Sequence, residues 1–66
     1  MKHVPLDSTH LASIAHEGNT LEVRFKNGNV YSYSGVPRES YLKLLSSPSP
    51  GTTFNALIKN KFKFRK

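Results

Sequence analysis

The stretch from Thr20 to Val36, TLEVRFKNGNVYSYSGV, most strongly limits the folds open to this chain. Two runs of alternating apolar and polar residues, 21–25 and 30–34, flank Asn27-Gly28. This dipeptide is typical of tight turns between antiparallel strands, so the stretch predicts a β-hairpin. Because a two-stranded hairpin alone is only marginally stable in water, the flanking segments must pack against it.

The sequence allows two registers for this hairpin, which place Tyr31 and Tyr33 on different faces. With a two-residue turn, Arg24 faces Tyr31, and both tyrosines form an exposed platform beside basic residues. With a three-residue loop in which Gly28 forms a bulge, Arg24 faces Val30, and both tyrosines enter the core. The first register buries two serines. A buried hydroxyl without a partner costs about 1–3 kcal/mol, whereas a buried aromatic ring stabilises by a comparable amount, so we favour the bulged register.

The flanking segments supply a third strand and two helices. Residues 11–16 predict a strand that pairs with 20–25 after a turn at Glu17-Gly18-Asn19. Pro37 favours a helix start, and apolar residues in 38–46 recur at helical spacing. Two prolines in 46–51 predict a loop, after which Thr52 or Thr53 would cap a second helix. We therefore expect an α+β fold: a three-stranded antiparallel meander covered on one face by two short C-terminal helices.

Length and charge limit the possible functions. We expect 66 residues to form one domain, 1–66, with 1–9 as a lead-in and 63–66 as a basic tail. The chain has no cysteine, so stability must come from one small core, from oligomerisation or from both. A net charge of +6 favours an anionic partner. No apolar run suits a membrane span or a signal peptide, so we expect a cytoplasmic protein without a membrane partner.

The start of the second predicted helix is the first candidate binding site. Helix N-termini leave backbone N–H groups unpaired and therefore bind phosphate readily. Glycine here permits close approach of the backbone, and neighbouring hydroxyls add donors. The same residues are also compatible with plain helix capping. The candidate ligand-binding residues in this segment are Ser49, Gly51, Thr52, Thr53, Asn55 and Lys59.

The C-terminal segment Lys59–Lys66, KNKFKFRK, is the second candidate site, with five basic residues in eight. Cations there would neutralise phosphates, and exposed rings would stack on bases. The alternative is that the phenylalanines pack on the core while the lysines are solvated. The candidate residues are Lys59, Lys61, Lys63 and Arg65, joined by Arg24 and Lys26 on the open sheet face.

The sequence gives little support for a metal site or for catalysis. His3, His10 and His16 lack carboxylate or cysteine partners at ligand spacing. Four acidic residues leave little material for acid–base chemistry. We therefore expect no metal, no cofactor and no catalytic residues.

Together these segments resemble the KTSC domain, a small domain also found at the C-terminus of some lysyl-tRNA synthetases. The resemblance runs from about Asp7 to Phe62. It departs from the family at His16 and Thr53, where an aromatic residue is common. The matching motifs are Ser8-Thr9, LEVRFKNG at 21–28, VYSYSGVP at 30–37, Tyr41 with Leu44-Leu45, Ser49-x-Gly51 and Phe54-Asn55-x-x-Ile58.

The resemblance implies an RNA- or nucleotide-binding module. We therefore expect a non-enzymatic module for an anionic ligand, first of all RNA or single-stranded nucleic acid. One alternative is a binder or sequestering protein for a small or cyclic nucleotide at an interface between subunits of a homo-oligomer. Another is a module that docks on a larger protein through the exposed edge of the strand 11–16.

Overall fold

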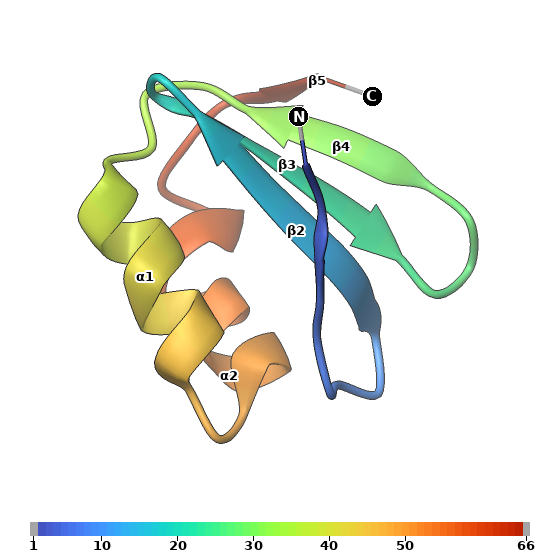
Figure 1. The fold of residues 1–66 in the computed structure, drawn as a ribbon. Helices are drawn as coiled ribbons and strands as arrows, with labels where there is room; N and C mark the ends of the chain where they lie inside the picture. The colour runs from blue at the N-terminus through green and yellow to red at the C-terminus, as the bar shows by residue number, and fades with distance from the viewer. Residues whose placement is uncertain (1, 66) are drawn as a thin grey trace.

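The computed structural model describes residues 2–65, which form one antiparallel sheet with helices packed on one of its faces (Figure 1). The five strands follow one another across the sheet in chain order. They are β1 (Val4–Pro5), β2 (Leu11–Glu17), β3 (Thr20–Phe25), β4 (Val30–Tyr33) and β5 (Phe64–Arg65). The helical elements are α1 (Arg38–Ser46), α2 (Pro50–Phe54) and the π-helix η1 (Asn55–Lys59).

The central hairpin adopts the bulged register. Arg24 lies opposite Val30, and Val23 lies opposite Tyr31. Gly28 has a φ of 96°, which a glycine adopts without steric cost, and its N–H donates to the Phe25 carbonyl at 3.0 Å. Tyr33 is consequently buried, and Tyr31 packs against the core. The prediction that the tyrosines join the helix-covered face is confirmed.

The predicted meander is the centre of a larger sheet, because a short strand is added at each edge (Figure 1). β1 pairs with Ser13 and Ile14 of β2, and β5 pairs with Ser32 and Tyr33 of β4. The edge of the strand 11–16 is therefore covered over Ser13 and Ile14, contrary to the expectation that it is exposed. Each added strand spans only two residues, too few to show a period-two pattern in the sequence.

The second helical segment begins earlier than the sequence predicted. Pro50 is its first residue, and the Thr53 N–H donates to the Ser49 carbonyl at 3.0 Å. The prediction that Thr52 or Thr53 caps this helix is therefore wrong. Proline suits the first helical position because its φ is preset and no N–H is needed there. The Thr53 side chain instead forms a hydrogen bond with the Ser47 hydroxyl.

The core lies between the sheet and the helices. α1 contributes Leu44, and the second helical segment contributes Phe54 and Ile58, as their spacing predicted. No helix within residues 2–65 is both long and apolar enough to cross a membrane. The buried core residues are Leu11, Ile14, Leu21, Val23, Tyr33, Val36, Leu44, Phe54 and Ile58.

Candidate functional site

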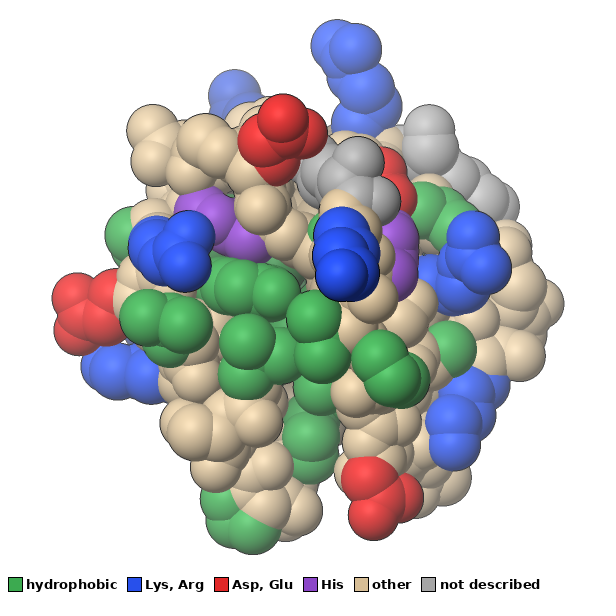
Figure 2. Space-filling model, in the orientation of Figure 1, with side chains coloured by type: hydrophobic (Ala, Val, Ile, Leu, Met, Phe, Trp, Pro, Cys, Tyr) green, Lys and Arg blue, Asp and Glu red, His purple; other side chains and the backbone are tan. Residues whose placement is uncertain are grey.

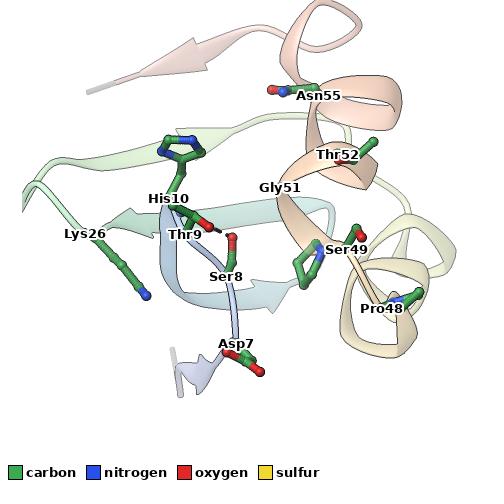
Figure 3. Close-up of a pocket in the computed structure, with 11 residues that line it drawn as sticks. Asp7, Ser8, Thr9, His10, Lys26, Pro48, Ser49, Gly51, Thr52 and Asn55 are labelled. Atoms are coloured by element: carbon green, nitrogen blue, oxygen red, sulfur yellow. Dashed lines mark hydrogen bonds between the residues drawn. The ribbon is translucent and has the colours of Figure 1, made fainter.

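A polar groove of about 610 Å³ lies between the segment that leads into β2 and the start of α2 (Figure 3). The Ser8 hydroxyl stands on one wall and accepts hydrogen bonds from the backbone N–H groups of His10 and Leu11. Gly51 forms the opposite wall, where a Cβ atom would lie 3.4 Å from the Ser8 Oγ. The lining residues are Asp7, Ser8, Thr9, His10, Lys26, Pro48, Ser49, Pro50, Gly51, Thr52 and Asn55.

A second groove, of about 380 Å³, adjoins the first and is mainly aromatic. The Phe54 ring meets the rings of Phe25 and Tyr33 edge-on, at centroid distances of 5.8 and 5.5 Å. His10, Gly51 and Asn55 line both grooves, so the two grooves lie side by side. The residues that line the aromatic groove are His10, Leu11, Phe25, Tyr31, Tyr33, Gly51, Phe54, Asn55 and Lys59.

The β5 edge carries an exposed aromatic ring between two cations. Phe64 is 57% exposed, and its ring lies nearly parallel to that of Tyr31, with an interplanar angle of 8° and a centroid distance of 5.1 Å. Phe64 pairs with Tyr33, which places it on the helix-covered face. Because side chains alternate along a strand, Lys63 and Arg65 project toward the opposite, outer face. We call the residues 61–65 the β5 edge.

Exposed apolar side chains also occur near the opposite edge of the sheet, formed by β1. Figure 2 shows hydrophobic side chains gathered where β1 and α1 lie near each other. Val4 of β1 is 36% exposed and Leu42 of α1 is 47% exposed. Of these three exposed hydrophobic residues within residues 2–65, Phe64 is the one with a basic residue on each side in the sequence.

The predicted binding residues fall into separate groups rather than one patch. Arg24 is exposed on β3 opposite Val30, and Arg65 pairs with Ser32, so both belong to the outer sheet face. Thr53 lines neither groove. Lys66 lies outside the described residues. The polar groove brings together Lys26, Ser49, Gly51, Thr52 and Asn55; the aromatic groove adds Lys59; the β5 edge holds Lys61, Lys63 and Arg65.

Sequence reasoning did not identify the residues that face the helix start across the polar groove. Asp7, Ser8, Thr9 and His10 come from a segment about 40 residues before Gly51 in the chain, and only packing brings them to it. The sequence pattern predicts Phe25 and Phe54 only as core residues, not as residues that line a groove. A detectable signal is the hydroxyl pair Ser8-Thr9 directly before a strand, since Ser and Thr hydroxyls stabilise local turns by bonding to nearby backbone groups.

The histidines hold local structure at two positions. His3 Nε2 lies 2.6 Å from Glu22 Oε1, and its Nδ1 lies 2.8 Å from the Ser13 hydroxyl. His16 stacks on Tyr41 at 5.3 Å and donates a hydrogen bond to the Val36 carbonyl. Within residues 2–65, no three His, Asp or Glu side chains gather in a way that could hold a metal ion.

The Tyr33 hydroxyl gives the fold a predicted dependence on alkaline pH. Burial, reinforced by the nearby Tyr31, raises the pKa of Tyr33 above its ordinary value of 10.0. The unfolded chain therefore loses this proton first as the pH rises. The protonated Tyr33 hydroxyl contributes fully to the stability of the fold below pH 10.0, and this contribution is lost as the pH rises through the folded-state pKa.

We expect the urea midpoint to fall above pH 10.0 and expect Tyr33→Phe to reduce that fall. An absorbance titration in which Tyr33 ionises at the ordinary tyrosine pKa would contradict this assignment.

A known structure has the same fold as this chain and matches it over almost its whole length. A crystal structure of a KTSC domain protein from Yersinia pestis superposes with a TM-score of 0.93 at 34% sequence identity. The superposition covers 98% of this chain and 94% of that protein. A lysine–tRNA ligase of Nostoc punctiforme is 42% identical over 52 residues, which are 79% of this chain and 9% of the ligase.

The family model for the KTSC domain matches residues 7–62. The resemblance read from the motifs is thereby confirmed. His16 stacks on Tyr41 and the Thr53 hydroxyl bonds to that of Ser47, so both side chains connect neighbouring elements. The chain belongs to the KTSC domain family.

Proposed function

We propose that this KTSC domain is a non-enzymatic module that binds RNA or other single-stranded nucleic acid through its β5 edge. The observation that carries the proposal is the exposed Phe64 ring, stacked on Tyr31 and flanked in the sequence by Lys63 and Arg65. Proteins that bind single strands combine cations along the phosphate backbone with aromatic rings under the bases.

The geometry suits a strand whose bases are unpaired. One face of the Phe64 ring is covered by Tyr31, and the ring also meets that of Tyr33 at a centroid distance of 5.6 Å, yet the residue as a whole is 57% exposed. A nucleobase that stacks on Phe64 would extend the ring pair by one layer. Lys61, Lys63 and Arg65 are exposed at the same sheet edge, with Lys63 and Arg65 directed to the outer face, and they supply three positive charges for the phosphates.

The overall charge and one relative support the same class of ligand. The net charge of +6 attracts polyanions over a range set by the ionic strength. The similar segment of the Nostoc punctiforme protein belongs to a lysine–tRNA ligase, and tRNA is an RNA. The chain spans only about 9% of that ligase, so the ligase activity is not part of the proposal.

The test is a binding titration of the intact domain with a short single-stranded RNA and with the duplex of the same sequence, over a series of salt concentrations. If three cations each neutralise one phosphate, the log–log slope against salt is about −2 for the single strand. We expect the single strand to bind more tightly than the duplex, because paired bases cannot stack on Phe64. The intrinsic fluorescence of the tyrosines should change on binding, since Tyr31 supports that ring.

Equal affinity for the duplex and the single strand would contradict stacking. Absence of binding to either RNA at low salt would overturn the proposal as a whole. A matched variant for the stacking step is Phe64→Leu, which keeps an apolar side chain at the same exposed position but removes the ring. It should weaken binding of the single strand without changing the salt slope.

A further inference from the structure

The polar and aromatic grooves together have the chemistry of a site for one nucleotide. One half is walled by the rings of Phe25, Tyr31 and Tyr33, and the other is lined by a lysine, hydroxyls and backbone. Each half has a volume within the range of small-molecule sites in proteins, about 300–1,000 Å³. A nucleotide is likewise divided into a flat, stackable base and an anionic phosphate.

We propose that this joined groove binds a single nucleotide of the nucleic-acid strand, with its base in the aromatic half and its phosphate in the polar half. The proposal rests on the proposed nucleic-acid function. Tyr31 connects the two sites, because its ring stacks with Phe64 and also lines the aromatic groove. A strand that lies over Phe64 thus meets the groove on the other side of Tyr31.

Lys26 is the cation assigned to the phosphate. It follows β3 and lines the polar groove together with Asp7 and Ser8, and it lies on the side of the 7–10 segment away from the start of α2 (Figure 3). Thr52 and Ser49 expose hydroxyls on the opposite wall, and neither hydroxyl has a hydrogen-bond partner within residues 2–65. These groups donate to phosphate oxygens without having to break an existing bond.

Asn55 is the group assigned to the base. It lines both grooves, is exposed and carries an amide that can donate and accept hydrogen bonds at once. Lys59, one helical turn later, lines the aromatic groove with it. A base edge held between these two side chains would face polar partners while its flat surface lies against the rings.

Asp7 makes the proposal sharply testable, because this acidic residue lines the same polar groove as Lys26. A negative charge there opposes a phosphate and would favour a cationic ligand. If the groove binds phosphate, Asp7→Asn must tighten binding, whereas Lys26→Gln must weaken it. At a separation near 4 Å in a solvent-exposed site, one unit charge changes affinity by about fivefold.

The experiment uses the intact domain and adenosine 5′-monophosphate as the probe, with adenosine and inorganic phosphate as controls, followed by amide chemical shifts in NMR spectra. We expect saturable shifts at Gly51 and Asn55, and a dissociation constant raised about fivefold by Lys26→Gln and lowered about fivefold by Asp7→Asn. The matched control is Arg24→Gln, which removes one exposed charge two residues away on the outer sheet face. It should leave the dissociation constant unchanged. Adenosine without phosphate should be insensitive to Lys26→Gln.

A parallel titration with single-stranded RNA separates this inference from the proposed function. If RNA binds and shifts only the β5 edge, with no response to adenosine monophosphate in the groove, the nucleotide site is wrong and the nucleic-acid function stands. If the mononucleotide binds in the groove but RNA does not bind, the groove assignment stands and the nucleic-acid function fails. Equal effects of Lys26→Gln and Arg24→Gln would overturn the groove assignment.

Discussion

An Ile58→Ala variant is expected to lose a large part of the free energy of unfolding of the domain. Ile58 is fully buried in η1, within the core that joins the helices to the sheet. Truncation of a buried isoleucine to alanine costs about 2–5 kcal/mol, because apolar area is lost and a cavity remains. A domain of 66 residues has a total free energy of unfolding of only about 3–10 kcal/mol, so this one change removes a large part of it.

Thermal and urea unfolding followed by circular dichroism would measure this effect. Ile58→Val, which removes one methylene, should cost about 0.5–1.5 kcal/mol and keep the domain folded. The matched control is Leu42→Ala on α1, where a side chain of similar size is 47% exposed and should cost about 0.5 kcal/mol or less. Equal losses at Ile58 and Leu42 would show that η1 does not contribute to the core as the structure indicates.

The elements predicted correctly are those whose cause is local in the sequence. The hairpin register follows from Gly28, which accepts a positive φ, and from the advantage of burying the tyrosines rather than the serines. The buried residues Leu44, Phe54 and Ile58 follow from helical spacing. In each case the residues that decide the structure lie within a few positions of one another.

The features missed depend on contacts between distant segments. β5 exists because the chain after η1 returns to β4, where the Ser34 N–H donates to the Lys63 carbonyl at 3.0 Å. The polar groove exists because Ser8 packs near Gly51. Cations that are close in the sequence also lie in different places: Arg24 is on the outer sheet face, whereas Lys26 lines the polar groove. Neither periodicity nor turn chemistry contains this information.

The largest expected effect on binding is that of a triple variant at the β5 edge, Lys61→Gln, Lys63→Gln and Arg65→Gln. If each of these cations neutralises one phosphate of a single strand, their loss weakens binding roughly 50-fold at 0.15 M salt and flattens the log–log salt slope by about 2. Neutral glutamine keeps the side chains polar and avoids the repulsion that glutamate would add. A competition assay with labelled single-stranded RNA would measure both quantities.

The control must lower the net charge equally at a different place. Lys2→Gln, Arg38→Gln and Lys43→Gln do so, because Arg38 and Lys43 lie on α1 and Lys2 precedes β1 at the opposite edge of the sheet. The Lys43–Glu39 ion pair is exposed, at 3.5 Å, and contributes little to stability. If both triple variants lose the same affinity and the same slope, the attraction is a property of the whole charge, and the β5 edge has no special role. A loss confined to the first variant means that the position of the cations at the β5 edge, rather than their number, determines binding.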